Sequence, residues 1–234
     1  MWTQVALTGL WGGLLVLERR AFLQAMFSRP LAACTGTGLL LDDLAAGVWV
    51  GVFFELLHLG SASLGGSNPE HDTLPSVTAT AAAAMVGEAA GGPSTPAVWA
   101  MSILLFLPMG KLGRTIEMAL DARAERYTAR AEDLMSEGQL RRAARQNLWG
   151  MWPHFCAFGL ICAAAAAVGP LLYQLESKLP LAVVRGLAWA YPAMTSAAAA
   201  VAVHGAHASH PLRMAGGGAV VAGLLALARL GDLW

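Results

Sequence analysis

Apolar runs of two different lengths make up most of this chain, and their lengths limit how it can fold. A helix needs about 20 apolar residues to cross a bilayer, whereas runs of about 10 to 14 indicate re-entrant or broken segments. Residues 148–173, 179–204 and 212–233 are long enough to span, but "LAACTGTGLLL" (31–41) stops at Asp42-Asp43 after eleven residues. The sequence therefore predicts an all-α integral membrane protein, a polytopic helical bundle with broken or re-entrant helices in its N-terminal half.

Composition supports lipid as the solvent. Of the 234 residues, 56% are hydrophobic and only 13% are charged, and the mean hydropathy is +0.55. That is about half the charge of an ordinary soluble domain. Fifteen basic residues balance fifteen acidic ones, so no nucleic-acid partner is expected, because such binding needs a surplus of Lys and Arg on one face. No sequence motif calls for a cofactor.

The N-terminal run "MWTQVALTGLWGGLLVLERR" carries its charges after its apolar part. This is the reverse of a cleavable signal peptide, so we expect a retained membrane segment in a multi-pass protein. We divide the one structural domain into an N-terminal membrane region (1–110), amphipathic surface helices (111–147) and C-terminal membrane helices (148–234). The prolines at 153, 170 and 192 are expected to kink or end the later helices.

Two titratable side chains interrupt the apolar range 44–60. Glu55 and His58 are three residues apart and share a face of a helix. A charge at the bilayer centre costs about 2.5 to 3.5 kcal/mol on insertion scales, so such residues usually face a bundle interior or a wet cavity. We therefore expect this helix, and the Ala- and Thr-rich range 73–90, to face protein. A structural hydrogen bond is the alternative role for Glu55 and His58.

A polar cluster follows directly, and its side chains suit a sugar. The range 61–72 contains Asn68, Glu70, His71 and Asp72. Unpaired backbone at membrane depth lines a cavity or is buried in protein, and broken segments commonly form substrate sites in transporters. Carboxylates and amides can bind the several hydroxyls of a neutral sugar. The alternative is an ordinary exposed turn.

Histidines and cysteines elsewhere give weaker signals. His204, His207 and His210 have a spacing that rotates away from a single point on a helix, so we favour a loop at a segment end over a metal site. The three cysteines, Cys34, Cys156 and Cys162, lack a CxxC pair. We expect them to be small buried residues.

The range 111–147 differs from the rest of the chain. It holds eight of the fifteen basic residues and six of the fifteen acidic ones. Its intermittent apolar positions indicate one or two amphipathic helices at the membrane surface, and its excess of Lys and Arg favours the cytoplasmic side. A solvated connector and a docking surface for a cytoplasmic partner are both consistent with it.

Several motifs in the N-terminal half resemble a known family. Arg29-Pro30-Leu31 opens the short apolar segment, "GLLLDD" ends it, Gly51 and Glu55 form Gly-x-x-x-Glu, and a Gly-rich loop runs to Asp72. In this order and spacing they resemble the enzyme IIC subunit of the mannose/fructose/sorbose class of bacterial phosphotransferase sugar permeases. The resemblance covers residues 5–150. The family loop commonly reads Pro-Pro-Asp or Ala-Pro-Asp, whereas this one reads "NPEHD".

The resemblance implies a permease subunit of the bacterial inner membrane that works with a IID membrane subunit and cytoplasmic IIA and IIB phosphocarriers. The C–D pairs would assemble further, with an elevator-like movement of a substrate-binding core. A hexose-type sugar would be phosphorylated from a histidine of IIB, so no residue of this chain needs to carry the phosphoryl group. By position, Glu55 matches a family Glu or Gln, and Asp72 or Glu70 matches the loop Asp.

Two other functions stay open from the sequence alone. An ion-coupled transporter could use Glu55 and His58 as a proton relay. A non-transporting sensor or scaffold could act through residues 111–147. The residues alone do not choose between these and the permease.

Overall fold

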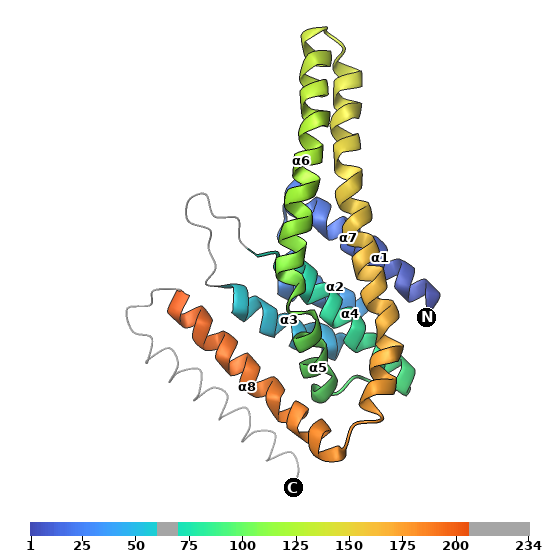
Figure 1. The fold of residues 1–234 in the computed structure, drawn as a ribbon, viewed down its shortest axis with the longest axis vertical. Helices are drawn as coiled ribbons and strands as arrows, with labels where there is room; N and C mark the ends of the chain where they lie inside the picture. Colours follow the sequence, from blue (N-terminus) through green and yellow to red (C-terminus); the bar gives the residue numbers. More distant parts are fainter. Residues whose placement is uncertain (60–69, 206–234) are drawn as a thin grey trace.

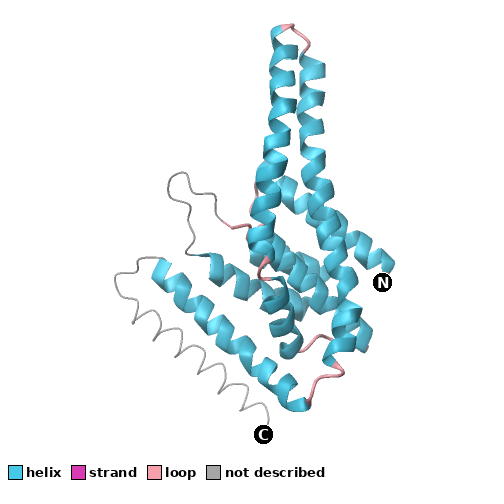
Figure 2. Ribbon diagram, in the orientation of Figure 1, coloured by secondary structure: helices cyan, strands magenta, loops and turns pink. Residues whose placement is uncertain are grey.

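The computed structural model describes residues 1–59 and 70–205, and within them every regular element is a helix (Figures 1 and 2). This confirms the all-α prediction. The helices are α1 (Trp2–Arg20), α2 (Pro30–Leu40), α3 (Leu44–Leu59), α4 (Thr73–Ala90), α5 (Pro96–Phe106), α6 (Met109–Ser136), α7 (Leu140–Glu176) and α8 (Leu181–Gly205).

Helix α4 is the centre of the bundle. Every residue from Thr73 to Gly87 is buried, and α2, α5 and α7 pack around it. Its Ala-rich surface lets these neighbours approach closely, since small residues take the place of bulky ones at helix contacts in membrane proteins. The prediction that this range faces protein is confirmed.

The short segments turn back on themselves as their lengths predict. Helix α2 has eleven residues and ends before Asp42, whose φ of 58° reverses the chain into α3. Buried Asp43 then accepts hydrogen bonds from Ala46 N (3.0 Å), Ser94 N (2.9 Å) and Ser94 Oγ (2.5 Å). This one carboxylate thus caps α3 and joins the α2–α3 turn to the α4–α5 turn.

Helices α1 and α7 cross at glycines. A Cβ on Gly159 would lie 2.8 Å from the carbonyl oxygen of Gly9, and one on Gly12 would lie 2.4 Å from Cys162 Sγ. Only hydrogen fits at these contacts. Cys34 and Cys162 are buried as expected, but Cys156 is exposed. The expectation for Cys156 was wrong because this residue lies on the outward face of α7.

Two described helices, α7 and α8, are long and apolar enough to cross a membrane, and the bent pair α5–α6 could make a third span. Pro153 and Pro170 lie inside α7 and Pro192 inside α8, and none of them ends its helix. Neighbouring groups can satisfy the backbone that a proline frees in a membrane helix. The predicted span 212–233 lies outside the described residues.

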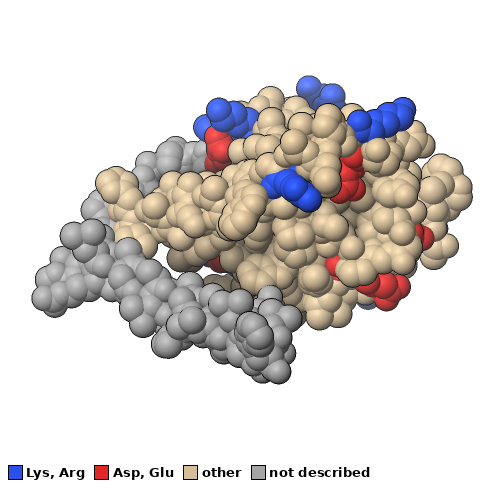
Figure 3. Space-filling model, turned by 90° about the horizontal axis from the view of Figure 1, so that it is seen from below, with Lys and Arg blue, Asp and Glu red and all other residues tan. Residues whose placement is uncertain are grey.

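The charged range 111–147 forms most of a hairpin. Helix α7 has 37 residues, which at about 1.5 Å per residue gives a length of about 55 Å, well beyond the roughly 30 Å of hydrocarbon. With α6 it forms two antiparallel helices that project from the bundle (Figure 1), instead of lying flat beside it. Helix α7 continues through positions 147 and 148 without a break. Viewed from the opposite end, charged side chains are few and scattered over the part not drawn in grey (Figure 3).

Candidate functional site

Polar side chains from near the ends of α1, α2, α3 and α4 and from within α6 and α7 form ion pairs and hydrogen bonds, and we call them the polar belt. The polar belt consists of Glu18, Arg19, Arg20, Arg29, Glu55, Asp72, Glu117, Asp121 and His154. It includes two of the carboxylates predicted from the sequence, Glu55 and Asp72. Each of them lies against an arginine.

Asp72 caps α4 and pairs with the last turn of α1. Its carboxylate accepts a hydrogen bond from Thr73 N (2.9 Å) and an ion-paired bond from Arg19 Nη1. The hydroxyl of Thr73 in turn donates to the carbonyl oxygen of Ser28 (2.7 Å). Burial raises the pKa of Asp72, but Arg19 outweighs it and holds that pKa below the ordinary value. The carboxylate is therefore ionised.

Glu55 pairs with Arg29, the residue that follows Ser28. Arg29 Nε donates to Glu55 Oε1 (3.1 Å), and Leu31 N donates to Oε2 (3.2 Å). The carboxylate thus also satisfies a free N–H at the start of α2, where a negative charge is favoured. Through Ser28 and Thr73, the Glu55 and Asp72 pairs belong to one connected network.

A cavity of about 920 Å³ opens beside Glu55 and Arg29. Its apolar wall includes Trp11, Phe27 and Leu31. The side chain of Glu55 is 19% exposed and that of Arg29 is 42% exposed, so both can reach a ligand there. An ion pair beside aromatic rings is an arrangement that can bind a small polar molecule.

The α1–α2 connection that forms part of this wall is held by Glu18. Its carboxylate accepts from Ser28 N (2.9 Å) and Phe27 N (3.3 Å). Within this connection Leu23 and Met26 have φ near +65°, a conformation that costs a residue with a Cβ. Glu18 therefore stabilises a strained segment next to the cavity.

His71 is buried between helices. Its Nδ1 accepts from Leu74 N (3.1 Å), its ring lies 4.7 Å from that of Phe158, and Nε2 has no partner among the described residues. Burial lowers the pKa of His71 to about 3, so the imidazole is neutral. His71, which the sequence predicted to contact the sugar, therefore stabilises the first turn of α4 instead.

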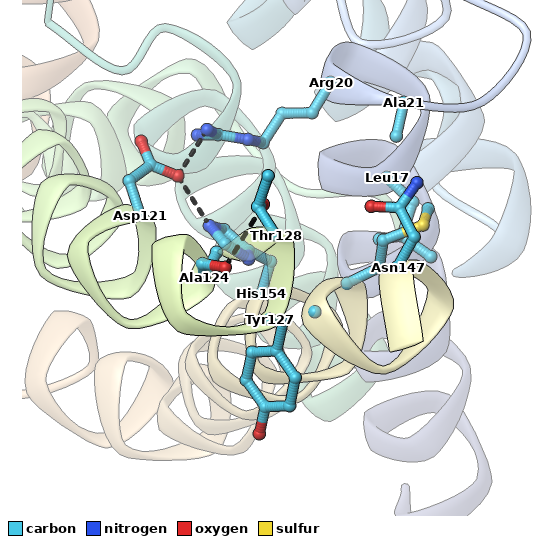
Figure 4. Close-up of a pocket in the computed structure, with 11 residues that line it drawn as sticks. Leu17, Arg20, Ala21, Asp121, Ala124, Tyr127, Thr128, Asn147 and His154 are labelled. Atoms are coloured by element: carbon cyan, nitrogen blue, oxygen red, sulfur yellow. Dashed lines mark hydrogen bonds and ion pairs between the residues drawn. The ribbon is translucent and has the colours of Figure 1, made fainter. Parts of the chain in front are cut away.

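Arg20 links α1 to both helices of the hairpin (Figure 4). It pairs with Glu117 (2.6 Å) and Asp121 of α6, and Asp121 also lies 3.1 Å from His154 Nε2 of α7. Arg20, Asp121 and His154 line a smaller cavity of about 170 Å³, and Tyr127 and Asn147 line it too. Three helices thus meet through one set of charges.

The other predicted residues lie in different surroundings. His58 Nδ1 lies 2.9 Å from the carbonyl oxygen of Phe54, and its ring stacks on that side chain. Glu70 is exposed next to Gly110. His204 lies in the last turn of α8. Asn68, His207 and His210 lie outside the described residues.

The arginine partners are what the sequence interpretation missed. Arg19 and Asp72 are 53 positions apart, and Arg29 and Glu55 are 26 apart. The sequence did mark Arg29 and Glu55 as unusual, because Arg29 directly precedes a short apolar helix and Glu55 interrupts another. The separations of 53 and 26 positions, however, do not show which arginine pairs with which carboxylate.

Comparisons with known proteins place the fold and the family. Two solved membrane structures share the fold. One is titled "Structure of membrane protein" (TM-score 0.67, 20% identity, covering 99% of this chain and 92% of that one). The other is a cryo-EM structure of the mannose transporter ManYZ in complex with microcin E492 (TM-score 0.61, 18% identity, 100% and 93% covered). No curated protein matches the sequence.

The family profile described as "PTS system sorbose-specific iic component" matches residues 2–204. This match covers nearly all of the described chain, including every member of the polar belt. The chain therefore belongs to the family of sorbose-specific IIC components of the phosphotransferase system.

Proposed function

We propose that this protein is the sugar-translocating IIC subunit of a phosphoenolpyruvate-dependent phosphotransferase system in the bacterial inner membrane. It would pair with a IID membrane subunit, and these pairs would assemble further. Cytoplasmic IIA and IIB proteins would supply the phosphoryl group, which a histidine of IIB transfers to a hexose-type sugar during uptake. The family membership supports this general role.

The Arg29–Glu55 pair beside the larger cavity is the observation that carries the proposal. A sugar hydroxyl both donates and accepts hydrogen bonds. Glu55 can accept from a hydroxyl while Arg29 donates to its neighbour, and charged partners make the stronger bonds. The apolar face of a sugar ring can then lie against Trp11 or Phe27, which line the same cavity.

The proposed sugar-contacting set is Glu55, His58, Asn68, Glu70, His71 and Asp72, to which we add Arg29. Within it, Asp72 and His71 act mainly by fixing the start of α4, because their described contacts go to Thr73, Arg19 and Leu74. Thr73, in this turn, donates a hydrogen bond to the carbonyl oxygen of Ser28, and the next residue, Arg29, pairs with Glu55. A change at Asp72 would thus alter sugar affinity indirectly.

The first experiment measures phosphoenolpyruvate-dependent uptake and phosphorylation of labelled hexoses in cells that carry the whole system. Losing a hydrogen bond to a charged group costs about 1.5 to 3 kcal/mol, so Glu55→Gln should reduce uptake at low sugar concentration by about 10- to 100-fold. Glu88→Gln is the matched control, since Glu88 is exposed and its ion-pair partner among the described residues is the N-terminus. Unchanged uptake in Glu55→Gln removes Glu55 from the site.

A charge swap separates sugar contact from a purely structural ion pair. The double variant Arg29→Glu with Glu55→Arg keeps opposite charges at the same positions. If the pair only holds α2 against α3, the swap should restore uptake relative to either single variant. Uptake that stays low although the protein inserts normally supports direct contact. Uptake that follows an imposed pH gradient and ignores phosphoenolpyruvate would refute the phosphotransferase role.

A further inference from the structure

The α1–α2 connection, residues 21–29, forms part of the larger cavity. Met26, Phe27 and Arg29 belong to this connection, and they line the cavity together with Trp11 of α1 and Glu55 of α3. The connection thus supplies the guanidinium that pairs with Glu55 and one of the two aromatic rings in the lining. Its conformation therefore decides where these two groups stand relative to a ligand.

Packing against the described helices contributes little to holding this connection. The side chains of Phe22, Leu23, Met26 and Phe27 are between 53% and 73% exposed. Hydrophobic stabilisation follows the apolar area that is buried, and the described protein leaves most of the apolar area of these four residues uncovered. Hydrogen bonds must therefore fix the backbone of the connection.

The backbone of the connection is also strained. Leu23, Gln24 and Met26 have φ of 64°, 48° and 66°, a region that is unfavourable for residues with a Cβ. Such conformations persist only where the surrounding structure holds them. Without its anchors the connection would relax toward ordinary backbone angles, and Phe27 and Arg29 would move with it.

Glu18, in the last turn of α1, is an anchor of this kind. Its side chain is buried, and its carboxylate oxygens accept from Ser28 N (2.9 Å) and Phe27 N (3.3 Å). Among the described residues it has no ion-pair partner, whereas the adjacent Arg19 and Arg20 pair with carboxylates farther along the chain. A buried carboxylate is costly unless it is hydrogen-bonded, so Glu18 and the two amides of the connection hold one another.

Glu18 does not line the cavity, so its effect on a ligand there must pass through the connection. We propose that Glu18 is a positioning residue that sets the sugar affinity of the larger cavity by holding Phe27 and Arg29 in place. A connection that is ordered only part of the time lowers the apparent affinity in proportion to the ordered fraction. The sugar assignment rests on the proposed function, whereas the bonds between Glu18 and the connection do not.

Uptake at a series of sugar concentrations, in cells that carry the whole system, tests the effect on affinity. Glutamine at position 18 keeps the length of the side chain but places an NH₂ group where an oxygen accepts. Glu18→Gln should raise the half-saturating concentration at least fivefold and leave the maximal rate per inserted protein within twofold. Glu18→Asp, which keeps both acceptor oxygens, should show a smaller increase, and Glu88→Gln should match the wild type. An unchanged half-saturating concentration in Glu18→Gln, or a fall in the maximal rate alone, overturns the proposal.

A double-variant cycle shows whether Glu18 acts through the connection. Phe27→Ala removes the ring that Glu18 positions. In the Phe27→Ala background, Glu18→Gln should therefore raise the half-saturating concentration by less than half of the factor seen in the wild type, since the effects of coupled residues do not add. Equal factors in both backgrounds mean that Glu18 acts elsewhere, and they refute the proposal.

Amide hydrogen exchange of the protein purified in detergent tests the anchor without transport. The amides of Phe27 and Ser28 should exchange at least tenfold faster in Glu18→Gln than in the wild type or in Glu88→Gln, because local opening exposes them. Unchanged exchange refutes the anchoring role. Wild-type uptake that Glu18→Gln leaves unaltered refutes only this inference, whereas no phosphoenolpyruvate-dependent uptake by the wild type refutes the proposed function.

Discussion

At the scale of single residues, the polar groups of the belt are held by partners distant in sequence. Glu55 and Asp72 each lie against an arginine. A buried charge without such partners is costly. Sequence could identify Glu55, because an isolated carboxylate in an apolar run needs an explanation, and it placed Asp72 in the polar cluster that follows. It could not identify Arg19 or Arg29 as their partners, because loop lengths do not determine which helix ends meet.

His71 makes the stability of the protein depend on pH. Burial lowers its pKa to about 3, against about 6.5 in an unfolded chain. Between these values the unfolded chain binds a proton that the folded one excludes, so stability falls as the pH falls below about 6.5. From pH 7 to pH 5, His71 should reduce the free energy of unfolding by roughly 2 kcal/mol. Thermal unfolding in detergent, followed by Trp fluorescence, measures this.

The control for this prediction is His71→Gln. Glutamine keeps an oxygen that can accept from Leu74 N but does not titrate. Its melting temperature should change less than that of the wild type between pH 7 and pH 5. If both proteins lose the same stability, another group is responsible for the pH dependence.

At the scale of elements, glycine positions decide how closely helices pack. The sequence has many glycines in apolar runs, and small residues allow close helix contacts, but the sequence does not say which glycines make them. In the structure Gly159 of α7 meets the backbone of Gly9, whereas a Cβ on Gly186 of α8 would meet no described atom within 4 Å outside its own helix. Of these two glycines, only Gly159 is a packing position.

Alanine at these two glycines should therefore have opposite effects. Gly159→Ala places a Cβ 2.8 Å from the Gly9 carbonyl oxygen, so α1 and α7 must separate, at a cost of about 1 to 3 kcal/mol. Gly186→Ala should be neutral or stabilise by up to about 1 kcal/mol through helix propensity. Melting temperatures of the two variants in detergent give the comparison. Equal melting temperatures would contradict the close α1–α7 contact.

At the scale of the whole molecule, the long α7 connects the bundle to the projecting hairpin. Ser136 ends α6 just before the hairpin turn, Ser177 follows the far end of α7, and both are exposed. If α7 crosses the bilayer, as its length and composition allow, these two positions face different compartments. The basic excess of the hairpin favours the cytoplasm for Ser136.

Cysteine labelling tests this topology. In a Cys156→Ala background, Ser177→Cys should react with a membrane-impermeant maleimide in intact cells. Ser136→Cys should react only in inverted vesicles. The remaining cysteines, Cys34 and Cys162, are buried and give low background. Labelling of both positions from the same side would exclude α7 as a simple span.

The sequence by itself determined the solvent and the helical class, because low charge and the lengths of apolar runs are local properties that need no folded partner. Its motifs, in their order and spacing, also indicated the family. It also marked Glu55 and His58 as residues that need protection inside an apolar run, and His71 and Asp72 as members of a polar cluster. Only the tertiary structure decided the partners: Glu55 pairs with Arg29, His71 packs against Phe158, and Asp72 pairs with Arg19. It also decided that the charged range stands out as a projecting hairpin, because both depend on which distant helix ends the fold brings together.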